Sequence, residues 1–398
     1  MRILNKMKQQ TQTKQLPKGW KKIPLSEVLD YEQPNGYIVN SEILVEKTPI
    51  PVLTANKGFI KGYTKETGGI YRNIPVIIFD DFTADNKFVN FPFKVKSSAM
   101  KILKIKDKNA HLKYIFYQMQ LRQVDTGTHK RYYLSSYQKL NFIFPIDKDN
   151  KINLPEQTLI VSAIETQFSR LEEAVKVLKS VKDKLRVYRK AVLKNAFEKK
   201  EGWEEKKIKD ICKLINGRAF KPSEWVGKGL PIIRIQNLNN EEAQFNYCDF
   251  EIDKRFYIDN GNLLFAWSGT PGTSFGAHIW KRGRAVLNQH IFKVEVNEKE
   301  INELFFMHLL NKNVQEYIQK AHGTAGLAHI TKGKFEEAKI SFPNPSEQFQ
   351  IVQSIESKFS VIDKVEGIVN QSLIKAEKLR KSILKSAFEG KLVKGEEK

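Results

Sequence analysis

The residue types with the clearest chemistry are arginine, glutamine, asparagine and histidine in the second half of the sequence. Arginine can bond guanine through two parallel hydrogen bonds, and asparagine or glutamine can bond adenine in the same way. Backbone N–H groups in loops rich in glycine, threonine and serine can approach phosphates closely. The sequence therefore predicts DNA contacts in this half from Arg218, Lys221, Arg234, Gln236, Asn237, Trp267, Ser268, Thr270, Thr273, His278, Asn288, Gln289 and His290.

The first half carries a related set, in which basic residues stand near tyrosines. Such combinations suit contacts to phosphates and base edges. The predicted contact residues of this half are Lys57, Lys61, Tyr63, Arg72, Lys87, Lys130, Arg131, Tyr132 and Tyr133. Each of them taken alone could be an ordinary exposed residue, so the prediction concerns the two sets as a whole.

Motifs that would carry catalysis are absent from the sequence. It contains neither a Gly-x-x-x-x-Gly-Lys-Ser/Thr phosphate loop nor a Gly-x-Gly-x-x-Gly dinucleotide motif. The Asn-Pro-Pro-aromatic motif of enzymes that methylate amino groups of DNA is also missing. Asp80, Asp81 and Asp85 are spaced too closely for the acidic motif of metal-dependent nucleases, and Cys212 and Cys248 cannot form a zinc cluster alone. We expect no catalytic residue, no metal ligand and no cofactor bound by this chain.

The charge of the chain favours a polyanionic partner. The 398 residues include 67 Lys and Arg against 45 Asp and Glu, a formal net charge of +22. Nucleic acid is the best candidate, because phosphates bind basic residues with release of counterions. The alternative is a basic protein with no such partner. Apolar runs fall short of the roughly 20 residues that cross a bilayer, and the polar N-terminus does not resemble a signal peptide, so we expect a cytoplasmic protein with no membrane partner.

An internal repeat organises the chain. Residues 346–391 match residues 155–200 without gaps at 17 of 46 positions, an offset of 191 residues. In both copies apolar residues recur every seven positions, which predicts two long helices with a coiled-coil seam. The seam residues are Leu171, Leu178, Leu185 and Val192 in the first copy and Ile362, Val369, Ala376 and Ile383 in the second. Between them the seam includes Ala174, Val181 and Tyr188 in the first copy and Val365, Ser372 and Leu379 in the second. A helix of ~40 residues would be about 60 Å long. The alternative is that each helix packs only on its own domain.

The segments before the two helices also form a pair. Each opens with Gly-Trp, at Gly19 and Gly202, and each contains short apolar runs that predict strands, such as 76–79 and 263–266. Residues 112–122 and 304–319 predict helices. We therefore expect an α+β fold with domains at 16–150 and 201–344 and long helices within 151–200 and 345–398.

These features together resemble the DNA-specificity (S) subunit of Type I restriction–modification systems, over nearly the whole chain. The resemblance rests on the repeat and on helix starts such as Glu156-Gln157. It also rests on the helix ends Ala196-Phe197-Glu198 and Ala387-Phe388-Glu389 and on the segments 265–270 and 287–290. Lys199 stands where the second copy has Gly390, so the two helices can end differently.

The resemblance implies that this chain recognises DNA and that partner subunits carry out catalysis. Each domain would be a target-recognition domain that reads one half of a bipartite, asymmetric site in double-stranded DNA. The long helices would pair antiparallel as a coiled coil, set the spacer between the half-sites and dock two methyltransferase (M) subunits through their seams. S-adenosylmethionine, ATP and Mg²⁺ would bind to the M subunits and to the translocase-nuclease (R) subunits. The S subunit would be non-catalytic.

Two other functions remain open at this point. The first is a single-chain DNA-binding nuclease or methyltransferase, which would need a catalytic motif that the sequence does not show. The second is a tandem-repeat adaptor that binds acidic proteins and has no role with DNA.

Overall fold

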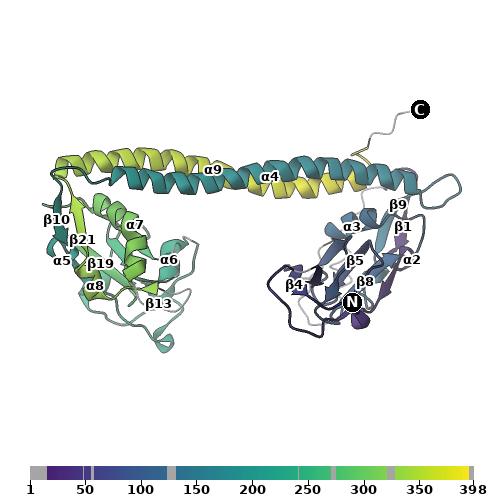
Figure 1. The fold of residues 1–398 in the computed structure, drawn as a ribbon, viewed down its shortest axis with the longest axis horizontal. Helices are drawn as coiled ribbons and strands as arrows, with labels where there is room; N and C mark the ends of the chain where they lie inside the picture. The colour runs from purple at the N-terminus through teal and green to yellow at the C-terminus, as the bar shows by residue number, and fades with distance from the viewer. Residues whose placement is uncertain are drawn as a thin grey trace. The chain divides into compact units, whose positions relative to one another are not determined.

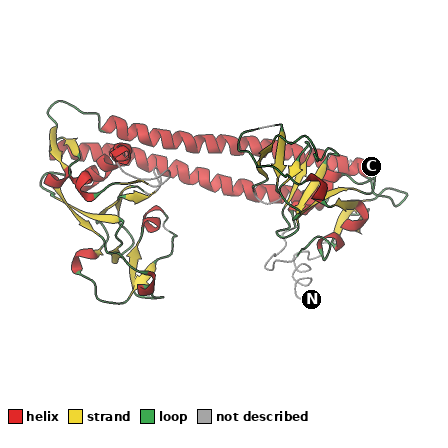
Figure 2. Ribbon diagram, turned by 60° about the horizontal axis from the view of Figure 1, so that its bottom comes forward, coloured by secondary structure: helices red, strands yellow, loops and turns green. Residues whose placement is uncertain are grey.

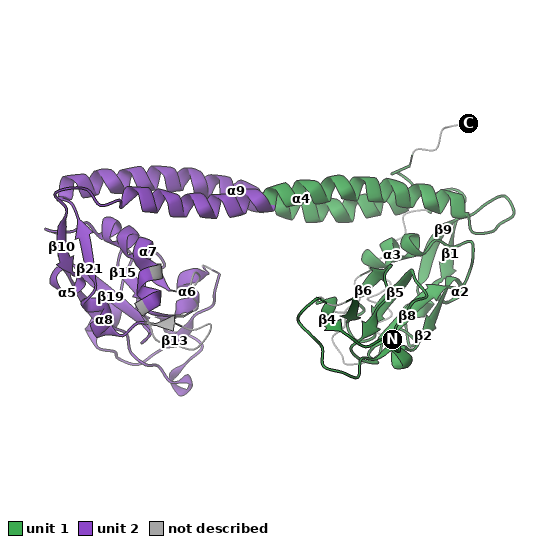
Figure 3. Cartoon of the chain, in the orientation of Figure 1, with its two compact units in different colours: residues 1–178, 371–398 green, residues 179–370 purple. Residues whose placement is uncertain are grey.

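The chain folds into two compact units, each of which combines a globular body with parts of two long helices. The computed structural model describes residues 16–47, 49–54, 58–122, 131–240, 242–269, 275–320 and 328–393. Unit 1 comprises residues 1–178 and 371–398, and unit 2 comprises residues 179–370. Figure 3 shows that the division falls inside both long helices rather than at their ends.

Unit 1 contains an antiparallel four-stranded sheet in the order β2-β8-β5-β6. Its strands are β2 (Leu29–Glu32), β8 (Met100–Ile105), β5 (Val76–Asp80) and β6 (Asn86–Val89). The first strand of the unit, β1 (Trp20–Pro24), pairs with the last, β9 (Asn141–Pro145), and α2 (Leu25–Val28) follows β1. Helix α3 (Leu112–Gln120) contributes Leu112, Tyr114 and Ile115 to the core of this sheet.

A second sheet of unit 1 has the order β4-β3-β7. Strand β3 (Ile50–Leu53) runs antiparallel to β4 (Ile60–Thr64) and parallel to β7 (Lys94–Val95). The 3-10 turns η1 (Pro34–Tyr37) and η2 (Tyr137–Lys139) complete the unit. A separate core that includes Leu53, Phe93 and Val95 lies under this sheet.

Unit 2 repeats the first sheet strand for strand and the second sheet with one additional strand. Its first sheet has the order β11-β19-β15-β17 and its second β13-β12-β18-β14. The strands of the first are β11 (Cys212–Asn216), β19 (Ile291–Val296), β15 (Leu263–Ala266) and β17 (Gly276–Ile279). Those of the second are β13 (Asn246–Cys248), β12 (Leu230–Ile233), β18 (Ala285–Leu287) and β14 (Tyr257–Ile258). Strand β12 runs parallel to β18, as β3 does to β7 in unit 1.

The remaining elements of unit 2 follow the same plan. Strand β10 (Glu204–Lys207) pairs with β21 (Lys339–Phe342) as β1 pairs with β9. The others are α5 (Ile208–Ile211), η3 (Pro222–Glu224), α6 (Ile235–Asn239), η4 (Lys254–Phe256), α7 (Glu303–Lys320) and α8 (Lys332–Glu336). Strand β16 (Ser268–Gly269) pairs with β20 (Ala328–His329). Both units combine strands with helices, which confirms the α+β fold class (Figure 2).

The two long helices are α4 (Leu154–Ala196) and α9 (Pro345–Phe388), which confirms that prediction (Figure 1). Both begin with the same cap, because the Asn153 side chain accepts the N–H of Glu156 and the Asn344 side chain accepts that of Glu347. One turn later a buried glutamine ties each helix to its globular body. Gln157 bonds the backbone of His111 and Asn109, and its repeat partner Gln348 bonds that of Asn302 and Glu300.

Within each unit, parts of α4 and α9 pair antiparallel. In unit 2, Lys182 bonds Asn370 and Arg189 bonds Asp363, so the partner number falls as the number along α4 rises. In unit 1, Arg380 of α9 bonds Glu172 of α4 and lies over the Phe168 ring. The eight seam residues that recur every seven positions are buried or half-buried. The interleaved Ala174, Tyr188 and Leu379 are exposed, so the prediction that they lie in the seam is wrong. Each helix therefore pairs with the other and also packs on a globular body.

The ends of the long helices complete the cores. The Phe388 ring of α9 lies 5.2 Å from that of Tyr114 in α3, and the Phe197 ring after α4 lies 5.2 Å from that of Phe305 in α7. These pairs occupy equivalent positions, because Phe197 and Phe388 are 191 residues apart, as are Tyr114 and Phe305. The first globular body thus receives the end of the second helix, and the second body receives the end of the first.

We expect Phe388→Ala to destabilise unit 1 by about 3–5 kcal/mol, because it removes a buried aromatic side chain from a packed core. Hydrogen exchange followed by mass spectrometry should show faster exchange in β1, β9 and α3 and unchanged exchange in the sheets of unit 2. Leu379→Ala is the control, since Leu379 lies on the same helix but is 50% exposed. Equal acceleration in both units would contradict the local role of Phe388.

Candidate nucleic-acid interface

Three loops of unit 2 meet at one end of its second sheet. They follow β11, β12 and β18, and backbone hydrogen bonds join them. The N–H of Arg218 donates to Leu287 O at 2.8 Å, and the N–H of Asn288 donates to Ile233 O at 3.1 Å. Gly217 permits this approach, because a Cβ atom there would lie 2.1 Å from Asn288 O.

The loops enclose a hollow of about 250 Å³, which we call the loop hollow. Its lining residues are Phe220, Trp225, Arg234, Ile235, Gln236, Asn288, Gln289 and His290. Five of these eight were predicted from the sequence as DNA contacts, and Phe220, Trp225 and Ile235 were not. The hollow thus brings amide, imidazole and guanidinium groups together beside aromatic rings, which is a set of groups suited to base edges.

Partial burial lowers the pKa of His290 and the positive charge of Arg234 lowers it further, which favours the neutral imidazole. A neutral imidazole offers one donor and one acceptor. Its ring lies 5.4 Å from that of Trp267, whose backbone N–H donates to His290 O. Trp267 therefore lies beside the His290 ring and also holds the backbone of His290.

Several other predicted residues of unit 2 have structural partners. Asn237 is buried, and its side chain bonds the backbone of Arg234, Ala243 and Gln244, so the prediction of a base contact there does not fit the structure. Arg218 forms an ion pair with Glu224.

His278 on β17 has a pKa lowered by burial. Lys221 is exposed, Ser268 is half-buried, and Thr270 and Thr273 lie outside the described residues.

The predicted residues of unit 1 do not converge in the same way. Tyr132 and Tyr133 are buried, and burial raises the pKa of Tyr133. Their side chains belong to the interior, so the prediction that they contact DNA does not fit the structure. Lys61, Arg72 and Arg131 are exposed, Tyr63 and Lys87 are half-buried, and Lys57 and Lys130 lie outside the described residues.

Sequence reasoning missed the unit 1 counterpart of the loop hollow. The Lys96 N–H donates to Leu53 O, as the Asn288 N–H donates to Ile233 O, so Lys96 is equivalent to Asn288. Thr54, Lys96, Ser97 and Ser98 therefore stand where unit 2 has Arg234, Asn288, Gln289 and His290. The repeat alone would not have located them, because its offset of 191 residues places Ser97 rather than Lys96 opposite Asn288 and residue 43 rather than Thr54 opposite Arg234.

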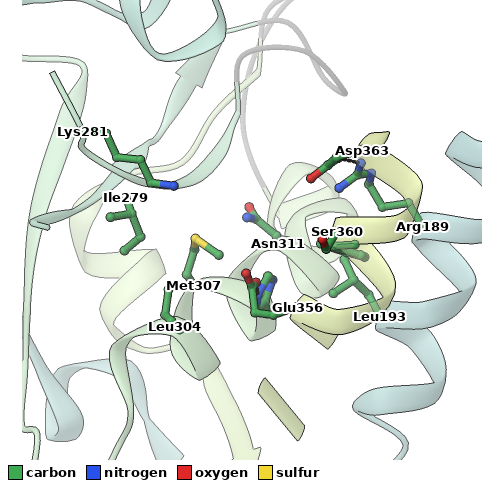
Figure 4. Close-up of a pocket in the computed structure, with 12 residues that line it drawn as sticks. Arg189, Leu193, Ile279, Lys281, Leu304, Met307, Asn311, Glu356, Ser360 and Asp363 are labelled. Atoms are coloured by element: carbon green, nitrogen blue, oxygen red, sulfur yellow. Dashed lines mark hydrogen bonds and ion pairs between the residues drawn. The ribbon is translucent and has the colours of Figure 1, made fainter. Parts of the chain in front are cut away.

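A second hollow of unit 2, of about 610 Å³, lies where α7 and β17 meet parts of α4 and α9 (Figure 4). Ile279, Leu304 and Met307 contribute apolar side chains to its lining, and Lys281, Glu356, Asp363 and Arg189 contribute charged ones. His308 also lines it, and Nε2 of this buried residue lies 2.7 Å from Oε1 of Glu356. In unit 1 the equivalent pair is the Tyr117 hydroxyl and Glu165, at 3.3 Å.

The acidic residues that loosely resembled a nuclease site have structural roles. Asp81 is buried and pairs with Lys101 at 3.1 Å, and it also accepts the Tyr133 N–H. Asp80 accepts the N–H groups of Phe82 and Thr83 in the following turn. Over the ranges that the structure describes, no three His, Cys, Asp or Glu residues gather in a way that could hold a metal ion. In the same ranges no helix is long and apolar enough to cross a membrane.

Comparison with known proteins identifies the class of protein to which this fold and these loops belong. A family described as the Type I restriction modification DNA specificity domain matches residues 200–372. A solved structure described as the structural basis underlying complex assembly and conformational transition of the type I R-M system has a similar fold. Its TM-score is 0.68 at 15% identity, over 95% of this chain and all of that one.

Curated relatives extend the match to most of the chain. The specificity subunit of the Type I restriction enzyme EcoR124I/EcoR124II from Escherichia coli is 30% identical over 364 residues, which is 87% of each protein. The EcoKI specificity subunit from Escherichia coli K12 is 26% identical over 289 residues, 65% of this chain and 61% of that one. The chain belongs to the family of Type I restriction enzyme specificity subunits.

We expect His308→Tyr to make the stability of unit 2 less sensitive to acid. Burial lowers the pKa of His308, and Arg189 lowers it further, against the hydrogen bond and charge of Glu356. The unfolded chain therefore binds this proton more readily, so stability is full above the unfolded pKa of about 6.5 and falls as the pH drops. Tyrosine is the residue that unit 1 carries at the equivalent position.

The measurement is the unfolding midpoint in urea between pH 7.5 and pH 5. Tyr117→Phe is the matched control, because it removes the equivalent hydrogen bond in unit 1 without removing a group that titrates in this range. An equal pH slope for His308→Tyr and the unaltered chain would contradict the assignment.

Proposed function

We propose that this chain is the DNA-recognition subunit of a Type I restriction–modification system and that each unit reads one half of a bipartite, asymmetric DNA target. The proposal rests on one observation: the two units have a common scaffold but different loop residues. The two units share both sheets and the helix attachments. At equivalent loop positions, however, unit 1 has Thr54, Ser97 and Ser98 where unit 2 has Arg234, Gln289 and His290. Because different side chains read different bases, the two half-sites should differ.

The long helices would set the spacer between the half-sites. Each runs without interruption from one compact unit into the other, and paired helices resist compression better than a flexible linker does. The positive net charge of the chain would supply the phosphate attraction that holds both units on the duplex.

Two methyltransferase subunits would dock on the helices outside the seam. Val177 of α4 and Ile368 of α9 are 54% and 56% exposed, and they occupy equivalent positions of the repeat. Tyr188 and Leu379 form a second such pair, at 51% and 50% exposure. Exposed apolar side chains at repeated positions suit two copies of one partner. The seam residues that recur every seven positions would then hold the helices together rather than contact the partners directly.

The catalytic steps would belong to the partner subunits. The methyltransferase subunits would bind S-adenosylmethionine and methylate adenine, and the restriction subunits would use ATP and Mg²⁺ to translocate and cut. This chain would bind none of these groups, and it would act as a non-catalytic subunit.

Sequencing of modified bases in the host genome tests the proposed function. Deletion of the gene should abolish one split motif that carries methyladenine, and re-expression of the chain should restore it. The purified chain alone, given DNA, Mg²⁺ and S-adenosylmethionine, should neither cut nor methylate. Cleavage or methyl transfer by the lone chain would favour a single-chain enzyme. An unaltered methylome together with no duplex binding would favour the adaptor function.

We expect Val177→Asp to reduce the number of methyltransferase subunits bound from two to one, because a buried carboxylate would weaken an apolar interface. Ile368→Asp should remove the other copy, and the double variant should bind neither. Native mass spectrometry of the mixed subunits measures the stoichiometry. Lys179→Asp is the control, since Lys179 is exposed on the other side of Leu178. Two bound copies in the double variant, or loss of binding in the control, would contradict this docking face.

A further inference from the structure

Arg234 is held in place within the loop hollow by three neighbours. Its Nη1 donates to Oδ1 of Asn246 on β13 at 3.2 Å, and its guanidinium lies over the Trp225 ring at 5.3 Å from the centroid. Its backbone N–H donates to the buried Asn237 side chain at 3.0 Å. Both the backbone and the guanidinium of Arg234 are therefore held in place. A donor group must be held in this way if it is to recognise a fixed pattern of hydrogen-bond acceptors.

The charge of Arg234 is not neutralised by the part of the chain that the structure describes. No described carboxylate lies at ion-pair distance from it. Three other arginines of unit 2 differ, because Arg218 pairs with Glu224, Arg189 with Asp363 and Arg255 with Asp253. Arg186, Arg282 and Arg284 also have no described ion pair, but they lie outside the lining of the loop hollow. A guanidinium has five donors, and Arg234 uses one of them on Asn246.

The neighbours of Arg234 in the hollow lack a competing charge. Gln236, Asn288 and Gln289 are amides, and partial burial together with the charge of Arg234 lowers the pKa of His290, which favours its uncharged form. A guanidinium with free parallel donors fits two acceptors on one rigid edge. Among the base pairs, guanine presents such an edge through O6 and N7 in the major groove.

We propose that Arg234 is a specificity-determining residue of unit 2 and reads a guanine of its half-site, with Asn246 and Trp225 as positioning residues. This inference rests on the proposed function. A phosphate contact is the competing role for a cation, and it has a different signature. Loss of a phosphate contact weakens binding to all sequences alike and lowers the salt slope by about 1, whereas loss of a base contact relaxes one position.

The experiment uses the full chain assembled with its methyltransferase subunits and reads out the methylated motif by sequencing. Arg234→Ala should relax one G·C position of one half-site, with about 10- to 100-fold less discrimination, and leave the other half-site unchanged. Arg234→Lys should not restore the discrimination at this G·C position, because an ammonium group cannot form the two parallel hydrogen bonds to guanine. Arg234→Gln should shift the preference toward A·T.

The positioning role of Asn246 has its own readout. Asn246→Val should relax the same position as Arg234→Ala, and Asn246→Ser, which keeps an acceptor, should preserve discrimination. Arg255→Ala is the matched control. Arg255 also lies over an aromatic ring, that of Phe256, but it pairs with Asp253. This variant should leave the motif intact.

The possible outcomes distinguish a failure of this inference from a failure of the proposed function. If the unaltered complex methylates no split motif, the proposed function fails. If the unaltered complex methylates a split motif, and if Arg234→Ala and Arg234→Gln both methylate that motif with the same bases required at every position, the inference is overturned and the proposed function stands. Uniform weakening across sequences with a lower salt slope also overturns it, in favour of a phosphate contact. The unfolding midpoint of each variant, together with an intact second half-site, shows that the chain is still folded.

Discussion

The packing of each long helix end into a globular body is the constraint on which the structure depends. Phe388 closes the core of unit 1 against Tyr114, and Phe197 closes that of unit 2 against Phe305. Each body also buries the first turns of the helix that directly follows it, through residues such as Ile164 and Ile355. Because each core takes in the last turns of the other helix as well, both long helices are buried at both of their ends. Apolar burial at both ends then holds α4 and α9 together along with the weaker polar contacts between them.

This exchange separates a fixed frame from variable loops. The frame repeats at the level of single hydrogen bonds, since Gln157 and Gln348 anchor the two helices through the same backbone groups. A buried side-chain amide that satisfies several backbone groups is costly to replace, because each group would lose its partner. Loop residues such as Thr54 and Arg234 do not anchor the long helices through hydrogen bonds of this kind. The two units keep the same fold although these loop residues differ between them.

The loop hollow shows how the frame prepares a polar site. Gly217 lets two loops approach until their backbones bond, and the parallel pairing of β12 with β18 brings Arg234 beside Asn288. Arg234 is half-buried there and has no described carboxylate partner. It uses one of its five donors on Asn246, so the others remain available to an acceptor-rich ligand.

The sequence by itself determined the repeat, the heptad seams of both helices and the composition of the loops. These features depend on neighbours within a few residues, so their period is visible along the chain. It did not determine which loop residues meet. Asn237 and Tyr133 have the residue types of a DNA contact, yet their side chains are buried, whereas Lys96 and Ser97 occupy the equivalent of the loop hollow. Only the tertiary structure decided this, because strand pairing joins segments that lie tens of residues apart, and burial follows from that pairing rather than from residue type.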